Sequence, residues 1–333
     1  MLWSRIVGRA DRYGERAAGR LNLIFYSYFS FLLIFFALPC LEGRRNLRFL
    51  TSMRYCRFTL NGLNHYGLVE SVAGRDEITR LLLQPPATSD GDVEGLPSRR
   101  MDRIPFAEAS LLAPVEPSKI VCVGRNYREH AAEFGHDVPT EPLIFLKAPT
   151  TLLAPGGTIL RPKISQRTDY EGELGVVIAR RCRHLREDED VRPYILGFTC
   201  VDDFTARDLQ TKDGQWTRAK GFDTFCPVGP LVSDGLDGLS NDEGVSKSTI
   251  DPWAGVQVET FVNGEVRQSG NTRDFIFALD VVLRFITQVM TLYPGDLIAT
   301  GTPSGVGPVV AGDVVEISIP GVGVLRNPVA DEG

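Results

Sequence analysis

The stretch TDYEGELGVVI, residues 168–178, places two acidic residues at the start of an apolar run. In a β-strand, residues i and i+2 point to the same face, so the side chains of Glu171 and Glu173 are expected to share one small volume. Two carboxylates that close repel each other and raise each other's pKa unless a positive charge compensates them. A metal ion, an arginine or solvent would each relieve the repulsion, and these two residues alone do not decide between them.

A second acidic pair follows another apolar run, in FTCVDDFTARD, residues 198–208. Strand alternation sends Asp202 and Asp203 to opposite faces, so one of them can join Glu171 and Glu173. Three carboxylates and water form an oxygen-only site that suits Mg²⁺ or Mn²⁺ better than zinc, which prefers nitrogen and sulfur ligands. The spacing leaves open the alternative that these acids are solvated residues at strand ends.

The composition is that of an ordinary globular protein: 43% of the 333 residues are hydrophobic and 23% are charged. A net charge of −6 and the lack of a basic stripe argue against a nucleic-acid partner and favour a small-molecule substrate. The six cysteines form no C-x-x-C pair, so we expect reduced, mostly buried thiols rather than a zinc knuckle or a redox motif.

Residues 1–52 differ from the rest of the chain. Residues 21–41 carry no charge and are long enough for one membrane span. Arginines lie on both sides of this stretch, so the positive-inside rule assigns no orientation. Two interpretations stay open: a membrane anchor, which would be the chain's only membrane contact and would leave the catalytic part in the cytoplasm, or an extension translated upstream of a domain that starts at Met53.

From Met53 onward the pattern predicts an α+β, strand-rich protein, with a small N-terminal α+β domain over 53–115 and a catalytic domain over 116–330. Two Asn-Gly pairs, at 61–62 and 263–264, predict β-hairpins. Helical patterns begin near Tyr127 and near Asp274, and in the second a stripe of apolar residues is expected to face the core. That stripe consists of Phe277, Val281, Phe285 and Val289.

Seven motifs then occur in a fixed order: GRNYREHAAE (124–133), PLIFLKAP (142–149), DYEGELGVVI (169–178), DDFTARDLQ (202–210), RAKGFDTFCPVGP (218–230), VNGEVRQ (262–268) and LIATGTPSGVG (297–307). Together they resemble the fumarylacetoacetate hydrolase family, and its acylpyruvate hydrolase branch in particular, from about Met53 to about Val329. The resemblance implies a mixed β-sandwich roll for the catalytic domain, and a homodimer.

The resemblance also implies roles for individual residues. The metal ligands would be Glu171, Glu173 and Asp203, with Asp202 as the non-ligand of its pair. His130 and Glu133 would form a His–Glu dyad on a short segment over the substrate, with His130 as the general base towards water. Lys220 would stabilise an oxyanion. The substrate pocket would further hold Arg125, Tyr127, Lys147, Gln210 and Thr302, the last as the residue that binds the substrate carboxylate.

The implied function is Mg²⁺- or Mn²⁺-dependent hydrolysis of a C–C bond in an acylpyruvate-type 2-oxo acid, with oxaloacetate decarboxylation as a further activity of the same site. An isomerase or decarboxylase of the 2-hydroxyhepta-2,4-diene-1,7-dioate type in aromatic catabolism shares the fold and the acids and stays open as the alternative. Two remoter readings are a membrane-tethered binding protein without turnover and a two-carboxylate glycosidase, which would need no metal.

Overall fold

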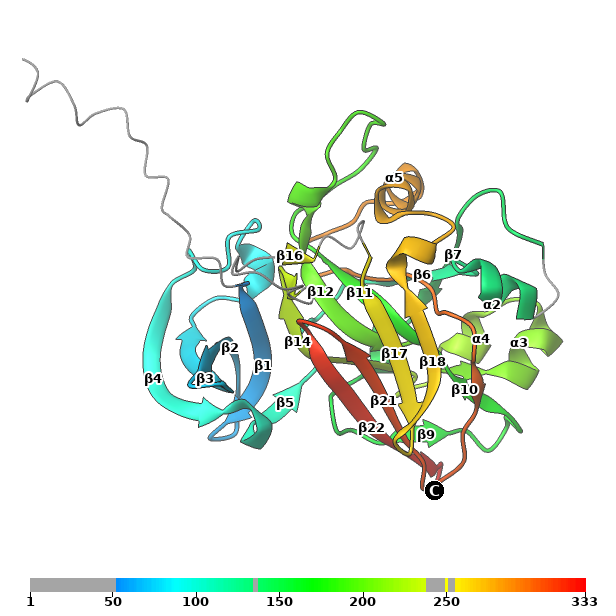
Figure 1. The fold of residues 1–333 in the computed structure, drawn as a ribbon, viewed down its shortest axis with the longest axis horizontal. Helices are drawn as coiled ribbons and strands as arrows, with labels where there is room; N and C mark the ends of the chain where they lie inside the picture. The colour runs from blue at the N-terminus through cyan, green and yellow to red at the C-terminus, as the bar shows by residue number, and fades with distance from the viewer. Residues whose placement is uncertain (1–51, 134–136, 238–248, 251–254) are drawn as a thin grey trace, which may run out of the picture. The chain divides into compact units, whose positions relative to one another are not determined.

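The structure, a computed structural model, describes residues 52–133, 137–237, 249–250 and 255–333 (Figure 1). The apolar stretch 21–41, the rest of the expected extension up to Thr51, and Cys40 lie outside these residues. Within the described part of the chain, no helix is long and apolar enough to cross a membrane. The five cysteines it contains are free and buried, as expected.

Residues 53–115 form antiparallel strands. The turn at Asn61 and Gly62 has positive φ at both residues, 52° and 76°, and pairs Leu60 with Leu63, which confirms the first predicted hairpin. The expected helical part of this region is wrong: apart from strands it contains two short 3₁₀ segments, because its apolar residues alternate and proline and glycine break up residues 84–97. The elements are β1 (Arg54–Leu60), β2 (Leu63–Val72), β3 (Arg75–Leu82), η1 (Pro86–Thr88), β4 (Ser98–Pro105), η2 (Phe106–Glu108) and β5 (Ser110–Leu112).

The largest sheet has 12 strands, in the order β4-β3-β2-β1-β14-β12-β11-β19-β6-β7, with β5 paired to β1 and β8 to β14. Its central strand β11 is buried on both faces along its whole length, which explains the near-continuous apolar run that follows the two glutamates. The remaining strands of this sheet are β6 (Ile120–Gly124), β7 (Leu143–Lys147), β8 (Leu152–Leu153), β11 (Gly172–Ile178), β12 (Ile195–Asp202), β14 (Cys226–Ser233) and β19 (Leu297–Ala299).

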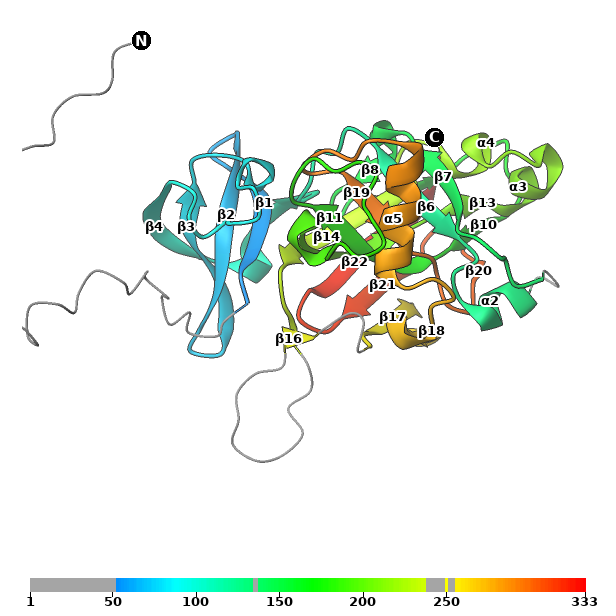
Figure 2. The ribbon, with the colours of Figure 1, turned by 90° about the horizontal axis from the view of Figure 1, so that it is seen from above.

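A five-stranded sheet, in the order β18-β17-β21-β22-β9, is layered against the larger one (Figures 1 and 2). Leu174 and Val176 of β11 share a hydrophobic core with Val258 of β17 and Ile317 of β21. This two-layer, strand-rich packing confirms the predicted fold class. The strands are β9 (Ile159–Arg161), β17 (Gln257–Val262), β18 (Glu265–Asn271), β21 (Val314–Ile319) and β22 (Gly323–Asp331); two small sheets contain β10 (Thr168–Tyr170), β13 (Thr205–Ala206) and β20 (Gly307–Pro308), and β15 (Leu236–Asp237) and β16 (Thr249–Ile250).

Both predicted helices are present, but one of them buries a different face. Helix α5 packs Leu279, Val282, Leu283 and Ile286 into the core, whereas Val281 and Val289 of the predicted stripe are 42% and 55% exposed. The buried set follows the i, i+3, i+4, i+7 spacing, while the predicted stripe used steps of four only and so drifts around the helix. The helices are α2 (Arg128–Glu133), α3 (Arg207–Asp213), α4 (Thr217–Lys220) and α5 (Leu279–Val289), and the 3₁₀ segments η3 (Pro149–Thr151), η4 (Arg192–Tyr194) and η5 (Thr272–Asp274) complete the fold.

Candidate active site

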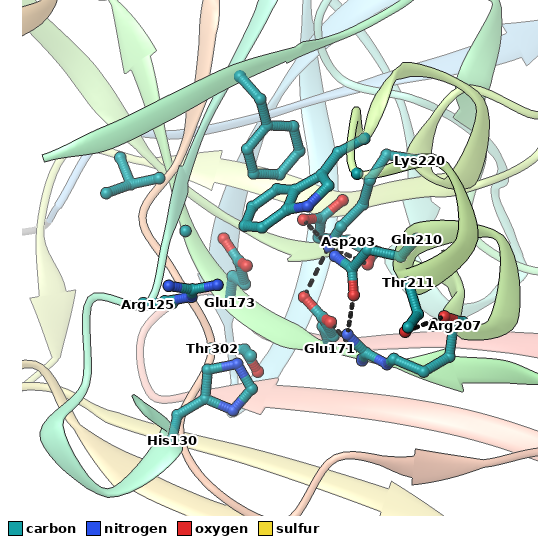
Figure 3. A pocket seen from close by; sticks show the side chains of 15 residues that line it. Arg125, His130, Glu171, Glu173, Asp203, Arg207, Gln210, Thr211, Lys220 and Thr302 are labelled. Atoms are coloured by element: carbon teal, nitrogen blue, oxygen red, sulfur yellow. Dashed lines mark hydrogen bonds and ion pairs between the residues drawn. The ribbon is translucent and has the colours of Figure 1, made fainter. Parts of the chain in front are cut away.

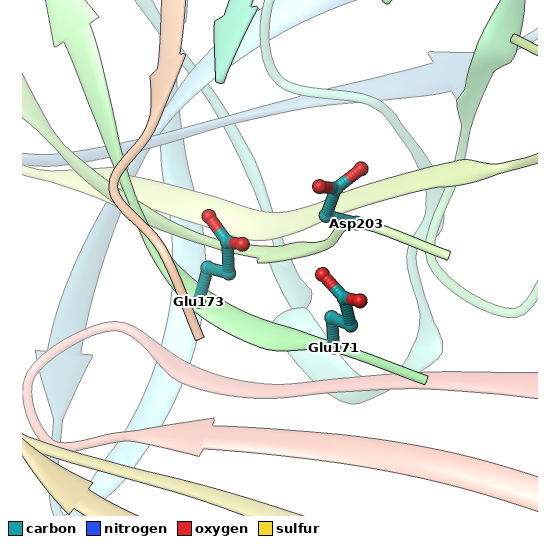
Figure 4. A group of neighbouring side chains, drawn as sticks. All are labelled: Glu171, Glu173 and Asp203. Atoms are coloured by element: carbon teal, nitrogen blue, oxygen red, sulfur yellow. The ribbon is translucent and has the colours of Figure 1, made fainter. Parts of the chain in front are cut away.

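Three buried carboxylates meet at the ends of two neighbouring strands. Glu171 precedes β11, Glu173 lies within it, and Asp203 follows β12 (Figure 4). The three side chains are between 2% and 5% exposed, and one oxygen of each lies within 4.8 Å of the others. The spacing argument therefore brought the right side chains together, and the sequence alternative of solvated strand ends does not describe them.

The backbone between the two glutamates lies close to the second sheet. A Cβ on Gly172 would stand 2.0 Å from Thr260 Oγ1 of β17, so the position admits only glycine without rearrangement. The Gly172 N–H also donates to Gln268 Oε1 at 3.0 Å. The glycine between the two glutamates is therefore required by packing against the second sheet.

Asp202 and Asp203 hold the Glu171 peptide from both sides. Asp202 Oδ1 accepts the Glu171 N–H at 2.8 Å, and the Asp203 N–H donates to the Glu171 carbonyl at 2.9 Å. The side chain of Asp203 points to the carboxylate cluster. That of Asp202 points to the Glu171 N–H, and its Oδ2 has no hydrogen-bond partner. Burial raises the pKa of Asp202 to about 7.

Two cations contact the cluster from one side (Figure 3). Lys220 Nζ donates to Glu171 Oε2 at 2.8 Å and to Asp203 Oδ2 at 2.5 Å. Arg207 donates to Glu171 Oε1 at 2.5 Å, to Asp169 and to Gln210. Burial raises the pKa of Glu171, but the Lys220 and Arg207 charges outweigh burial and hold that pKa well below its usual value. Of the metal, arginine and solvent that the sequence left open, positive side chains therefore account for part of the compensation.

Glu173 is compensated least. Its carboxylate accepts the Gly301 N–H at 2.7 Å, and its pKa is raised well above the ordinary value by burial and by the charges of Asp203 and Glu171. A buried carboxylate beside two others is the environment that a bound cation relieves. Three carboxylates with no nitrogen or sulfur donor among them suit a hard divalent ion such as Mg²⁺ or Mn²⁺, so the residues present fit such an ion.

His130 and Glu133 lie on helix α2 beside this cluster. His130 Nδ1 and Glu133 Oε2 are 3.4 Å apart, a long contact, and the Glu133 carboxylate also accepts the Gly305 N–H at 3.3 Å. Burial lowers the pKa of His130, against the opposing charges of Glu171 and Glu133. An imidazole with a lowered pKa is neutral at physiological pH, which is the form that accepts a proton.

These groups surround one cavity of about 360 Å³ (Figure 3). Its lining contains eight of the eleven predicted site residues: Arg125, His130, Glu171, Glu173, Asp203, Gln210, Lys220 and Thr302. Thr302 Oγ1 donates to the Gly172 carbonyl at 3.0 Å and accepts from Gln268 Nε2 at 2.8 Å, so its orientation is fixed.

Three predicted residues do not line this cavity. Lys147 is fully buried behind Asp203, with Nζ 2.7 Å from Asp203 Oδ1, so its position differs from that of the substrate contact that the resemblance implied. Tyr127 packs edge-to-face on Phe275, with ring centroids 5.0 Å apart. Glu133 contacts His130, which does line the cavity. The roles of all eleven residues stay predictions.

Several lining residues were missed at the sequence level. Arg207 stands in the quoted motif DDFTARDLQ, and its spacing of three from Gln210 on a helix was the available signal. Trp216 and Phe145 form an aromatic wall, with ring centroids 5.0 Å apart, which no local pattern indicates because they come from α4's N-terminal flank and from β7. The other additional lining residues are Val123, Gly124, Thr211 and Gly214.

Two family models match the chain. Residues 119–330 match the model described as fumarylacetoacetate (FAA) hydrolase C-terminal, which spans more than half of the chain. The chain belongs to the fumarylacetoacetate hydrolase family. Residues 53–114 match a second model, described as Rv2993c-like, N-terminal.

Relatives of this fumarylacetoacetate hydrolase family member include proteins with different named activities. An uncharacterised protein of Methanocaldococcus jannaschii is 47% identical over 218 residues, 66% of this chain and 85% of its own. The oxaloacetate tautomerase YisK of Bacillus subtilis is 40% identical over 236 residues, 67% of this chain and 74% of its own. The mitochondrial oxaloacetate tautomerase Fahd2a of Rattus norvegicus is 39% identical over 235 residues, 68% and 71% of the two chains.

Solved structures of the family show the same fold. A 2-hydroxyhepta-2,4-diene-1,7-dioate isomerase from Mycobacterium marinum has a TM-score of 0.70 and 37% identity, over 85% of this chain and all of its own. A maleylpyruvate hydrolase from Sphingobium sp. SYK-6, in complex with manganese(II) and pyruvate, has a TM-score of 0.63 and 29% identity, over 84% of this chain and all of its own. The family thus contains tautomerases, isomerases and hydrolases.

Proposed function

We propose that this chain is a divalent-metal-dependent hydrolase that cleaves the C–C bond of acylpyruvate-type 2-oxo acids. The observation that carries the proposal is the shared cavity: three buried carboxylates that fit a hard cation and a histidine with a lowered pKa line the same space. Neither group alone requires this chemistry. Together they provide charge stabilisation and proton transfer within reach of one substrate.

In this proposal His130 takes a proton from a water molecule, and Glu133 orients the imidazole through Nδ1 and stabilises its protonated form. The water oxygen bonds to the distal carbonyl carbon of the acylpyruvate. The bond between that carbon and C3 then breaks, its electron pair stays on the pyruvate fragment as an enolate, and a carboxylic acid leaves. Proton transfer to C3 of the enolate gives pyruvate.

The chemistry that a divalent cation held by Glu171, Glu173 and Asp203 supplies is positive charge that stabilises the developing enolate. The manganese(II) and pyruvate in the Sphingobium structure support this assignment, and Mg²⁺ and Mn²⁺ are both compatible with the oxygen donors. Lys220 adds a fixed positive charge at the same wall of the cavity and would stabilise an oxyanion. Thr302 and Gln210 would contact the polar groups of the substrate.

A second candidate is the interconversion of keto and enol forms of a 2-oxo acid such as oxaloacetate. It is favoured by the similarity, at 40% and 39% identity, to two proteins named oxaloacetate tautomerases. In this reaction His130 would take a proton from C3, the oxygen at C2 would gain a proton, and the reverse step would restore the keto form, without attack by water. Isomerisation or decarboxylation of a dienedioate belongs to the same class, since each requires an enolate of a 2-oxo acid.

The experiment that separates these candidates is a substrate panel with and without Mg²⁺ or Mn²⁺. Pyruvate release from acetylpyruvate and fumarylpyruvate reports hydrolysis, and the loss of the enol absorbance of oxaloacetate reports tautomerisation. We expect pyruvate release that EDTA abolishes and that His130→Gln lowers by about 100-fold or more. Tautomerisation without pyruvate release would replace the first candidate by the second, and metal-independent release of pyruvate would refute the metal-dependent hydrolase.

We further propose two domains, 53–115 and 116–330, and a homodimer. The separate family-model matches, to residues 53–114 and 119–330, support the domain boundary. Sedimentation of the full chain tests the homodimer.

A further inference from the structure

Arg207 contacts three acceptors that belong to different parts of the site. Its Nη2 donates to Glu171 Oε1 at 2.5 Å and its Nη1 to Gln210 Oε1 at 2.7 Å, so the guanidinium joins a proposed metal ligand to a proposed substrate contact (Figure 3). Its Nε donates to Asp169 Oδ2 at 2.9 Å. Asp169 does not line the cavity, and no sequence pattern assigns it a role.

Asp169 is a buried carboxylate shared by two arginines. Its side chain is inaccessible to solvent, and Arg167 donates to both of its oxygens, from Nε at 2.9 Å and from Nη2 at 3.0 Å. Burial of a carboxylate is costly unless the group is paired and hydrogen-bonded, and the two guanidinium groups meet that requirement. The side chain of Arg167 is 48% exposed and does not line the cavity, whereas that of Arg207 is 12% exposed and reaches the acidic cluster.

The backbone also places Asp169 and Arg207 beside each other. Strand β10 pairs with β13, with Asp169 opposite Thr205, and the Arg207 N–H donates to the Arg167 carbonyl at 2.8 Å. Arg207 is the first residue of α3, so the start of this helix is fixed to the end of β10. The Arg207 side chain is therefore held at both ends, by the strand pairing at its backbone and by Asp169 at its guanidinium.

We propose that Asp169 is a positioning residue, which holds the Arg207 guanidinium on Glu171 and so strengthens the binding of a divalent cation without contacting the cation or the substrate. The inference rests on the proposed metal site and adds a residue that supports it from outside. Loss of a group that hydrogen-bonds a metal ligand typically costs about 10- to 100-fold in metal affinity or activity. Arg207 is such a partner of Glu171, and Asp169 fixes the direction of Arg207.

The shape of the guanidinium explains how Asp169 acts through it. The group is a planar fork with fixed donor directions, so the bond from Nε to Asp169 also sets the direction of Nη2 towards Glu171. Without Asp169, rotation of this long side chain would take Nη2 away from Glu171 or bring the positive charge further into the cavity, where it would repel a cation. Either movement weakens metal binding.

The test measures Mn²⁺ affinity by electron paramagnetic resonance for Asp169→Ala and Asp169→Asn in the full chain, with circular dichroism as the check of folding. Asp208→Asn is the matched control. It removes the same charge next to Arg207 in the chain, but the Asp208 carboxylate accepts hydrogen bonds from Ser165 and Gln166.

We expect Asp169→Ala to weaken Mn²⁺ binding by about tenfold or more. Asp169→Asn keeps an oxygen acceptor for Arg207 but not the charge, so a smaller loss of about threefold or more is expected, and this variant decides the matter if Asp169→Ala does not fold. Asp208→Asn should bind Mn²⁺ within about twofold of the wild type. Wild-type affinity in both Asp169 variants, or an equal loss in Asp208→Asn, would overturn the inference.

A double-mutant cycle with Arg207→Met shows whether Asp169 acts through Arg207. Methionine keeps an unbranched side chain but has no donor for Glu171. In this background Asp169→Ala should change Mn²⁺ affinity by less than about twofold, because the side chain that it positions is absent. The same loss in both backgrounds would mean that Asp169 acts on the cation directly through its charge, which contradicts the proposal.

Nuclear magnetic resonance of the chain labelled with ¹⁵N-arginine tests the positioning without metal. The Nε–H signal of Arg207 is identified by its absence from Arg207→Met. We expect Asp169→Asn to speed the exchange of this proton with water by about tenfold or more, because its buried carboxylate partner is lost. Unchanged exchange would contradict the role of Asp169, whereas a wild type that binds no Mn²⁺ but shows the change would count against the proposed function alone.

Discussion

Asp202 and Asp203 are adjacent in the chain, yet their side chains meet different groups. The carboxylate of Asp203 joins the acidic cluster, and that of Asp202 accepts the N–H of Glu171 while its second oxygen has no partner. A group that holds the backbone of a metal ligand typically affects metal affinity by 10- to 100-fold. We therefore propose that Asp202 supports metal binding through the Glu171 backbone without being a ligand itself.

We predict that Asp202→Asn keeps the Mn²⁺ affinity of the wild type within about threefold, because the amide oxygen can still accept the Glu171 N–H. Asp202→Leu, whose side chain branches at the same carbon but has no acceptor, should weaken Mn²⁺ binding by about tenfold or more. Electron paramagnetic resonance of free Mn²⁺ measures both, and circular dichroism shows whether each variant is folded. Equal affinities for the two variants would rule out the backbone contact as the cause.

At the scale of elements, the positions of Glu171 and Glu173 depend on the close packing of β11 against β17. Gly172→Ala would place a Cβ 2.0 Å from Thr260 Oγ1, which is itself buried without a hydrogen-bond partner. We predict that Gly172→Ala lowers the free energy of unfolding by about 1–3 kcal/mol. Adding Thr260→Ala removes the obstructing oxygen, so the double variant should regain part of that loss, as urea titrations of all four proteins in a double-mutant cycle would show. Strict additivity would contradict the proposed clash.

Helix α2 is attached to the segment after β19 by two carboxylates. Glu129 accepts the Ser304 hydroxyl at 3.1 Å, and Glu133 accepts the Gly305 N–H at 3.3 Å. We predict that Ser304→Ala speeds amide hydrogen exchange in residues 128–133 and lowers kcat by about two- to fivefold, while Mn²⁺ affinity stays unchanged because neither partner is a proposed ligand. Unchanged exchange in this helix would show that the Ser304 contact does not hold it.

The elements also show where local patterns suffice. Both Asn-Gly hairpins formed as predicted, since the turn is specified by two adjacent residues with positive φ. The predicted buried face of α5 was wrong because two overlapping sets of apolar residues run along this helix. The packing of the helix against the core decides which set is buried, and the local sequence does not specify that packing.

At the scale of the whole molecule, we expect the proposed metal binding to be coupled to stability. Three carboxylates within 4.8 Å repel one another in the metal-free chain, and a bound cation removes that repulsion. A ligand that binds only the folded state stabilises it by about 2.7 kcal/mol at 100 times its dissociation constant. We predict that Mn²⁺ at this level raises the melting temperature of the wild type, and that EDTA reverses the rise.

Glu173→Gln provides the matched test. We predict that, at neutral pH in EDTA, this variant melts above the wild type, because burial and the charges of Asp203 and Glu171 disfavour the ionised form of Glu173 in the folded chain, whereas an amide carries no such cost. With Mn²⁺ the order should reverse, since a ligand is lost. Differential scanning fluorimetry measures both comparisons, and a variant that melts below the wild type in both conditions would count against the electrostatic account of the cluster.

The candidate site was predictable from sequence to an uneven extent. The grouping of Glu171, Glu173 and Asp203 could be predicted from strand alternation and the order of the motifs, because the local strand sequence determines to which face each side chain points. Lys147 behind Asp203, and the contact between Trp216 and Arg125, could not be predicted. Both depend on which strands become neighbours, and the sheet order joins β6, β11, β12, β14 and β19 from distant parts of the sequence.

The close packing of Gly172 against Thr260 has a consequence for how such an enzyme could acquire new substrates. The backbone between Glu171 and Glu173, whose side chains line the cavity, packs against the second sheet, and Gly172 tolerates almost no added volume there. The walls of the cavity include Gln210, Thr211 and Trp216, in and beside α3 and α4, and in the described part of the chain none of the three forms a hydrogen bond with the acids. Changes of specificity, by evolution or by design, are therefore expected in the walls, while the backbone that carries the acids stays unchanged.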